Sequence, residues 1–288
     1  MVTPLLDNGE IDRPSLHKML DLYLDAGTIP FILGTTGESA SLSLKQRETM
    51  VRETAGFIAD RSKLYAGIYD TCFENILAQA EEYARLGIMT FVAHLPAYYP
   101  LTPLQVENYF VLLADLLPGE LIVYNIPATT KISIPIEIIG SLSRHPKIIG
   151  LKDSERSVER MEKLAALFAE REDMTIYSGW THKSTFALGL GFDGIVPSTG
   201  NLIPHRFFEL YRAVVEGNTP LAEKLQAEID PIADLHQKDR VLSDGIILLK
   251  LMMTELGLCG PDVLPPLQRF RPDEEKRVRA FVRNLKLK

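Results

Sequence analysis

The sequence is poor in the residues that build disulfides, metal centres and nucleic-acid surfaces. Its two cysteines, Cys72 and Cys259, lie far apart and lack the spacing of a metal site. The six histidines form no His-x-His or His-x-x-His pair. A formal net charge of -7 argues against a nucleic-acid binder. We therefore expect free thiols in a cytoplasmic protein with no metal and no nucleic-acid partner.

Long apolar runs and several catalytic signatures are missing as well. No apolar run reaches the roughly 18 residues of a membrane span, and the N-terminus turns polar at Asp7, so we expect neither a membrane partner nor a signal peptide. No glycine-rich phosphate motif follows an expected strand, which weakens a nucleotide-binding interpretation. The sequence also has no Gly-x-Ser-x-Gly elbow and no carboxylate pair placed for glycoside cleavage.

What is present is a regular alternation of short apolar runs and amphipathic stretches. The expected strands are residues 2–4, 29–33, 64–66, 90–93, 121–123, 148–152, 175–177 and 194–196. The expected helices are residues 15–26, 44–59, 74–86, one opening at 102–103, one near 135, 158–169 and 182–189. Ser43 and Gln46 fit a capping box before the second helix.

Eight such units predict an α/β protein with a (β/α)8 barrel in residues 1–201, with a doubly wound sheet as the alternative. Residues 202–288 have helical periodicity with breaks at Gly217, Gly257 and 261–266, and we expect a helical region packed on the barrel. Lys286 and Lys288 are expected in a solvated helix end.

Lys152 ends the apolar run 148–151, where a charged side chain is unusual. One interpretation is a lysine that snorkels, or that pairs with Asp153 or Glu155. The other is an amine nucleophile. Burial lowers a lysine pKa from its usual value of about 10.4, and the neutral amine attacks carbonyl groups.

Further polar residues follow the expected strands, and barrel active sites lie at these carboxyl ends. They are Thr35, Thr36, Glu38, Tyr98, Tyr99, Tyr124, Asn125, Thr129, Thr130, Ser178, Gly179, Ser198 and Thr199. A lysine with tyrosines and threonines suits imine chemistry, in which a tyrosine shuttles protons. Each residue also has a structural interpretation, as a core tyrosine, a helix cap or an ordinary turn. His94 is interpreted as structural.

Four motifs carry a family resemblance. They are Gly34-Thr35-Thr36-Gly37-Glu38-Ser39, Tyr98-Tyr99, Tyr124-Asn125-Ile126-Pro127 and Gly150-Leu151-Lys152-Asp153-Ser154. In this order they resemble the dihydrodipicolinate synthase / N-acetylneuraminate lyase superfamily over nearly the whole chain. The resemblance implies a pyruvate-dependent class I aldolase or dehydratase on a (β/α)8 barrel.

The resemblance also implies roles for individual residues. Lys152 would form a Schiff base with pyruvate, and Tyr124 would be the acid/base that orients the imine carboxylate. Thr35 and Thr36 would bind that carboxylate, and Thr36 would relay protons. Tyr98 would complete the relay across the subunit interface of a homotetramer or homodimer. The remaining substrate-binding residues would be Gly37, Thr129, Thr130, Gly179 and Val196. No metal and no organic cofactor is implied.

Departures from the family pattern bear on the substrate. Synthases of the dihydrodipicolinate type carry an arginine where this chain has Thr129, and threonine cannot replace a bidentate carboxylate clamp. Sialic acid lyases usually read Gly-Ser-Thr-Gly-Glu where this chain reads Gly-Thr-Thr-Gly-Glu. The hydroxyl-rich loops look most like those of 2-keto-3-deoxy sugar acid aldolases and suit a polyhydroxy aldehyde.

We therefore predict a cytoplasmic lyase that cleaves or forms a 2-keto-3-deoxy sugar acid, to or from pyruvate and an aldehyde, through a Lys152 imine. One alternative is 4-hydroxy-tetrahydrodipicolinate synthase activity, which condenses pyruvate with aspartate semialdehyde. Another is a catalytically silent barrel that binds pyruvate or regulates a partner.

Overall fold

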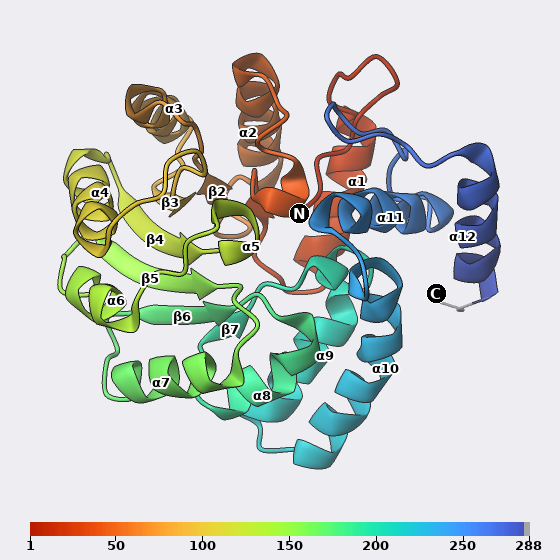
Figure 1. Cartoon of the computed structure of the whole chain (residues 1–288). Helices are drawn as coiled ribbons and strands as arrows, with labels where there is room; N and C mark the ends of the chain where they lie inside the picture. The colour runs from red at the N-terminus through yellow and green to blue at the C-terminus, as the bar shows by residue number, and fades with distance from the viewer. Residues whose placement is uncertain (285–288) are drawn as a thin grey trace. The chain divides into compact units, whose positions relative to one another are not determined.

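A computed structural model describes residues 1–284 of the chain (Figure 1). Lys286 and Lys288, expected in a helix end, lie outside these residues. The chain divides into two compact units. The first contains residues 1–64, 198–210 and those from Lys224 onward, and the second contains Tyr65–Pro197 and Tyr211–Glu223. The domain boundary predicted at residue 201 stays a prediction.

The second unit is built on six strands that follow one another in chain order. They are β2 (Tyr65–Gly67), β3 (Thr90–His94), β4 (Glu120–Asn125), β5 (Ile148–Asp153), β6 (Thr175–Ser178) and β7 (Gly194–Ile195). All neighbouring pairs are parallel. A doubly wound sheet has a point where the strand order reverses, and the order within this unit has none. The expected barrel-type winding is therefore confirmed over the doubly wound alternative.

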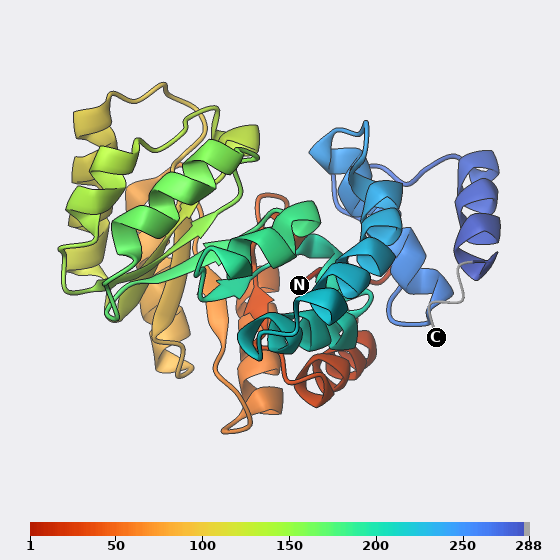
Figure 2. The same ribbon diagram turned by 90° about the horizontal axis from the view of Figure 1, so that it is seen from below.

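Helices separate these strands, as the alternation predicts. They are α3 (Phe73–Arg85), α4 (Pro103–Leu116), α5 (Pro127–Thr130), α6 (Ile136–Leu142), α7 (Val158–Phe168) and α8 (Ser184–Gly189). Figures 1 and 2 show α3, α4, α6 and α7 along the outer side of the curved sheet. The apolar runs become its core, with Phe91, Leu121 and Leu151 fully buried. Because the strands need cover on both faces, these runs are apolar throughout rather than alternating.

The first unit contains α1 (Arg13–Asp25), β1 (Phe31–Ile32), α2 (Leu44–Ile58), α11 (Leu242–Glu255) and α12 (Pro272–Asn284). Helices α9 (Pro204–Val215) and α10 (Thr219–Gln237) run through both units. The capping box of Ser43 and Gln46 is confirmed. The expected breaks at Gly217 and Gly257 are confirmed too, at backbone φ angles of +72° and +68° that favour glycine.

The expectation of a first strand at residues 2–4 is wrong. The structure assigns no strand there, and the nearest pairing is an isolated antiparallel bridge between Leu5 and Ile11. The polar groups of this segment find other partners. The Val2 N–H donates to the side-chain oxygen of Asn201, and the Thr3 hydroxyl donates to the Gly37 carbonyl. Pro4 has no N–H to contribute to a strand ladder.

Candidate active site

Lys152 lies next to the end of β5 and is only 6% exposed. Its Nζ donates to the Ser154 hydroxyl at 3.0 Å and stands 3.4 Å from the centroid of the Tyr124 ring. The proposed ion-pair partners Asp153 and Glu155 bind Arg160 instead. Burial lowers the pKa of Lys152, while the Tyr124 hydroxyl and the Asp153 carboxylate oppose that shift. The site thus favours the neutral, nucleophilic amine.

The strand register places other reactive side chains beside Lys152. Lys152 is paired with Tyr124 of β4 and with Tyr177 of β6, and Tyr124 is paired with His94 of β3. Residues paired in register on parallel strands project to the same face of the sheet. The rings of His94 and Tyr124 meet edge to face, with centroids 6.0 Å apart. One face of this unit therefore carries Lys152 between Tyr124 and Tyr177, with His94 beyond Tyr124.

Gly179, just after β6, leaves room for the Ser154 side chain beside the lysine. A β-carbon added at Gly179 would lie 2.0 Å from Ser154 Oγ. The Gly179 N–H donates to the Asp153 carbonyl at 2.7 Å, which ties the two strand ends together. Gly179 therefore fixes where Ser154 sits. Ser154 belongs to the lysine motif, and the sequence predicts no role for it.

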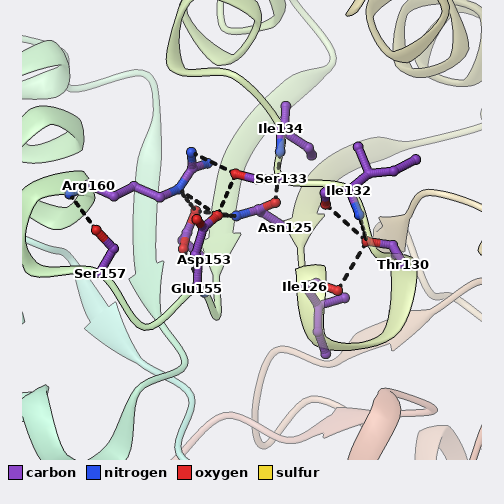
Figure 3. A network of polar contacts seen from close by, with 10 residues as sticks. All are labelled: Asn125, Ile126, Thr130, Ile132, Ser133, Ile134, Asp153, Glu155, Ser157 and Arg160. Atoms are coloured by element: carbon purple, nitrogen blue, oxygen red, sulfur yellow. Dashed lines mark hydrogen bonds and ion pairs between the residues drawn. The ribbon is translucent and has the colours of Figure 1, made fainter. Parts of the chain in front are cut away.

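A buried polar network supports the segment that carries Lys152 (Figure 3). Arg160 of α7 donates through Nε to Asp153 at 2.8 Å, with both side chains more than nine-tenths buried. Asn125 donates to Asp153 at 2.9 Å and to Glu155 at 3.1 Å, and Ser133 donates to Glu155 at 2.6 Å. The network joins the ends of β4 and β5 to helix α7. Sequence reasoning missed it, because Arg160 lies on an expected helix face with no distinguishing signal.

The turn after β4 uses one predicted site residue for its own structure. The buried Thr130 hydroxyl shares its proton between the carbonyls of Ile126 and Ile132, at 3.1 and 3.0 Å, and accepts from the Ile132 N–H. Figure 3 shows these bonds closing the turn. Its hydroxyl is therefore engaged in the turn rather than held out for a substrate. Thr129 is half-buried, and its hydroxyl donates to the Ile126 carbonyl at 3.3 Å.

In the first unit, Thr35, Thr36 and Gly37 form a single 3-10 turn. Thr35 and Thr36 are half-buried, and the Gly37 carbonyl accepts from the Thr3 hydroxyl at 2.6 Å. The turn ends at Glu38, whose backbone is left-handed with φ of 56°. Non-glycine residues adopt this conformation only when their surroundings impose it.

The Glu38 side chain supplies that constraint. Its carboxylate lies 2.5 Å from Nζ of Lys250, and both side chains are fully buried. The same carboxylate accepts from the Leu264 N–H at 3.1 Å, and Lys250 donates to the Asp262 carbonyl at 2.5 Å. Helix α11 and the segment after it therefore anchor the turn of Thr35 and Thr36. No sequence signal marked Lys250, which lies in the apolar middle of α11.

The remaining predicted site residues lie at the edges of the second unit. Tyr98 and Tyr99 are 78% and 70% exposed, and their rings meet at right angles 5.0 Å apart. Val196 follows β7, and its N–H donates to the Ser178 carbonyl. The structure thus brings Lys152, Tyr124 and Gly179 together within this unit and leaves Tyr98 exposed on the single chain.

Within residues 1–284, no cluster of three or more His, Cys, Asp and Glu side chains could hold a metal ion. In the same residues, no helix is long and apolar enough to cross a membrane.

The profile of the Dihydrodipicolinate synthetase family matches residues 1–285. The chain belongs to this family. It is 27% identical over 286 residues to the 4-hydroxy-tetrahydrodipicolinate synthase of Pseudoalteromonas atlantica, which covers 99% of this chain and 96% of the relative. It is 26% identical over 284 residues to the enzyme of that name from Neisseria gonorrhoeae, covering 98% and 96%.

Solved structures of dihydrodipicolinate synthase family proteins share the fold. The dihydrodipicolinate synthase of Bacteroides thetaiotaomicron matches with a TM-score of 0.91 at 26% identity, covering 99% of this chain and 96% of that one. YagE, an E. coli prophage protein of the family in complex with pyruvate, matches with a TM-score of 0.92 at 22% identity, covering 100% and 97%. These likenesses confirm the predicted (β/α)8 barrel with C-terminal helices.

Family membership makes the protein an enzyme, a pyruvate-dependent class I aldolase of the carbon-carbon lyase type or a related hydro-lyase. Members of the dihydrodipicolinate synthetase family act through a Schiff base between a lysine and pyruvate, without a metal. The interpretation of the sequence as an enzyme of this superfamily is therefore confirmed.

Proposed function

We propose that the protein cleaves or forms a 2-keto-3-deoxy sugar acid through an imine between Lys152 and pyruvate. The observation that carries this proposal is the position of Lys152 Nζ, buried, 3.0 Å from the Ser154 hydroxyl and 3.4 Å from the Tyr124 ring. A buried amine that makes no ion pair with the nearby carboxylates is suited to attack a ketone. The complex of the family member YagE with pyruvate supports pyruvate as the keto acid.

In the cleavage direction, the neutral Lys152 amine adds to the keto carbon of the sugar acid, and the resulting carbinolamine loses water to give the imine. The bond between the third and fourth carbons then breaks. Its electron pair forms the enamine of pyruvate, while the fourth carbon leaves as an aldehyde. Protonation of the enamine and addition of water release pyruvate and restore Lys152. We propose Tyr124 as the group that moves protons in these steps.

Thr35, Thr36 and Gly37 are proposed to bind the keto-acid carboxylate through hydroxyls and backbone N–H groups, with Thr36 also relaying protons. This proposal rests on the motif and on the 3-10 turn that presents both threonines half-buried. Gly179 and Val196, whose N–H groups bond to neighbouring strand ends, are proposed to line the substrate.

We propose Tyr98 as a residue that completes the relay in a second copy of the chain, in a homotetramer or homodimer. Its 78% exposure on the single chain supports a role outside its own barrel. Sedimentation analysis of the wild type tests the oligomer, and the activity of Tyr98→Phe tests the proton relay. A monomer with full activity would contradict it.

The aldehyde half of the substrate depends on Thr129. A carboxylate-bearing acceptor such as aspartate semialdehyde calls for a cation, and Thr129 offers only a hydroxyl that already donates to the Ile126 carbonyl. The names of the synthase relatives favour the second candidate, condensation of pyruvate with aspartate semialdehyde. Thr129→Arg separates the two candidates. A gain of activity with aspartate semialdehyde in that variant would show that residue 129 determines which acceptor aldehyde is used.

Borohydride reduction in the presence of pyruvate, followed by peptide mass spectrometry, tests the imine. We expect an adduct on Lys152 in the wild type and none in Lys152→Met. Lys147→Met is the matched control, because Lys147 Nζ donates to the carbonyls of Asp115 and Leu117 at the other end of β5. Absence of a Lys152 adduct in the wild type would contradict the proposed imine mechanism. An aldehyde panel then decides between sugar acid and semialdehyde chemistry.

A further inference from the structure

His94, interpreted from the sequence as structural, is the last residue of β3 and lies on the face that carries Lys152. Carboxyl ends of barrel strands are where catalytic and binding residues are found. His94 is half-buried, and its strand partner is Tyr124, the same residue that covers Lys152. Its position alone places it among the groups that a substrate bound at Lys152 would meet.

The His94 ring is held in one orientation. On one side the Tyr69 ring lies nearly parallel to it, with centroids 4.6 Å apart and planes at 31°. On the other side Tyr124 meets it edge to face at 6.0 Å. Its Nδ1 lies 2.7 Å from the Leu95 carbonyl, which only an N–H can approach so closely. Within residues 1–284, Nε2 has no hydrogen-bond partner.

The charge state of His94 follows from its surroundings. Burial lowers the pKa of His94, the bond to the Leu95 carbonyl opposes this, and Lys152 lowers it further whenever it is protonated. The other groups packed against the ring are Tyr69 and Tyr124. A neutral imidazole with the proton on Nδ1 leaves a lone pair on Nε2. His94 therefore presents a hydrogen-bond acceptor and no charge.

We infer that His94 is a specificity-determining residue, whose Nε2 accepts a hydrogen bond from a hydroxyl on the aldehyde half of the substrate. Two strand spacings of about 4.8 Å separate His94 from Lys152, and a short carbon chain attached to Lys152 spans that gap. A neutral acceptor binds a hydroxyl and gives nothing to a carboxylate. The inference rests on the proposed function and deepens it.

The test compares pyruvate condensation with two aldehydes, glyceraldehyde and propanal, which differ in the hydroxyls that His94 would read. His94→Phe keeps the ring stacking but removes the acceptor. We expect kcat/KM with glyceraldehyde to fall about 10- to 100-fold, and with propanal to change less than about threefold. His94→Gln, which restores an acceptor oxygen, should recover part of the preference. His94→Leu gives the same comparison should the phenylalanine variant fail to fold.

Borohydride trapping of pyruvate on Lys152 at the wild-type rate shows that a variant is folded and still forms the pyruvate imine. Normal trapping with equal losses for both aldehydes, or with no loss for either, overturns the role of His94. A wild type that traps pyruvate but uses glyceraldehyde no better than propanal overturns it as well. A wild type that traps no pyruvate overturns the proposed function and this inference with it.

Discussion

Gly179 and Ser154 are so close that a β-carbon at position 179 would stand 2.0 Å from the Ser154 hydroxyl oxygen. That hydroxyl lies 3.0 Å from Nζ of Lys152. The methyl group added by Gly179→Ala must therefore displace Ser154 and the end of β5, which lie next to Lys152. Displacement of a reacting group by about 1 Å can cost about 100-fold in rate, and we expect a loss of that order in borohydride trapping of pyruvate.

Gly189→Ala is the matched control for this substitution. Gly189 ends helix α8, and within residues 1–284 its added β-carbon would meet no atom within 4 Å apart from its chain neighbours and the backbone of its own helix. It should trap pyruvate at the wild-type rate. The double variant Ser154→Ala/Gly179→Ala removes the oxygen that the new methyl group strikes, so it should regain part of the loss. A Gly179→Ala variant that traps normally would show that this contact does not position the lysine.

The pH dependence of imine formation reports the pKa of Lys152. Burial lowers that pKa below the ordinary lysine value, and only the neutral amine adds to the ketone. Trapping should therefore rise with pH and level off at a pH below that of an ordinary lysine. The Tyr124 hydroxyl raises the pKa of Lys152, so Tyr124→Phe should move the midpoint to still lower pH.

The same Tyr124→Phe variant should lose turnover about 100-fold or more, because it lacks the proposed acid/base. Tyr109→Phe is the control for loss of a tyrosine hydroxyl, since the buried Tyr109 hydroxyl has no hydrogen-bond partner within residues 1–284. Its midpoint should match the wild type. A midpoint that rises in Tyr124→Phe would contradict the assigned effect of the hydroxyl on Lys152.

Arg160 neutralises Asp153 behind the lysine strand, through an Nε bond of 2.8 Å. Arg160→Met leaves the buried Asp153 carboxylate with hydrogen bonds from Asn125 and from the Glu155 N–H. Removing one partner of a buried ion pair costs about 3–5 kcal/mol, and urea unfolding should show a loss of that size.

Two comparisons make the Arg160 experiment specific. Asp153→Asn/Arg160→Met removes the unpaired charge and should recover part of the stability. Arg85→Met breaks an ion pair whose arginine is 66% exposed, and surface pairs contribute less than about 1 kcal/mol. Equal losses in Arg160→Met and Arg85→Met would mean that the buried network adds no stability.

Local patterns in the sequence were enough to predict the strand that carries Lys152 and several of the elements around it. The apolar run before the lysine, the cap of Ser43 and the breaks at Gly217 and Gly257 are features of neighbouring residues, and the structure confirms each of them. The prediction of a first strand at residues 2–4 was wrong because the polar groups of this segment bond to residues far away in the sequence. Val2 bonds to Asn201, which no local pattern reveals.

The supporting contacts of the candidate site were beyond local patterns for the same reason. Gly179 matters because of Ser154, on a different strand end, and Lys250 matters because of Glu38, on a different turn. A lysine in an apolar helix carries no sign of its partner. Glu38 lies in one of the four family motifs, but the motif does not show that its side chain binds Lys250 and the Leu264 N–H.

Lys250 and Glu38 form an ion pair at 2.5 Å in which both side chains are fully buried. Among residues 1–284, Lys250→Met leaves the buried Glu38 carboxylate with one remaining donor, the Leu264 N–H. An unpaired buried charge is strongly destabilising, so we expect a loss of about 3–5 kcal/mol in urea unfolding. The turn of Thr35 and Thr36 should loosen with it, because Glu38 holds its left-handed end.

Glu38→Gln/Lys250→Met tests whether the charge or the shape is responsible. The double variant keeps the size of both side chains without a charge, and buried pairs are often replaced in this way at little cost. It should therefore be more stable than Lys250→Met alone. Lys163→Met, which breaks the exposed pair with Glu159, should unfold at the wild-type midpoint. A Lys250→Met variant with that same midpoint would show that the pair does not anchor the turn.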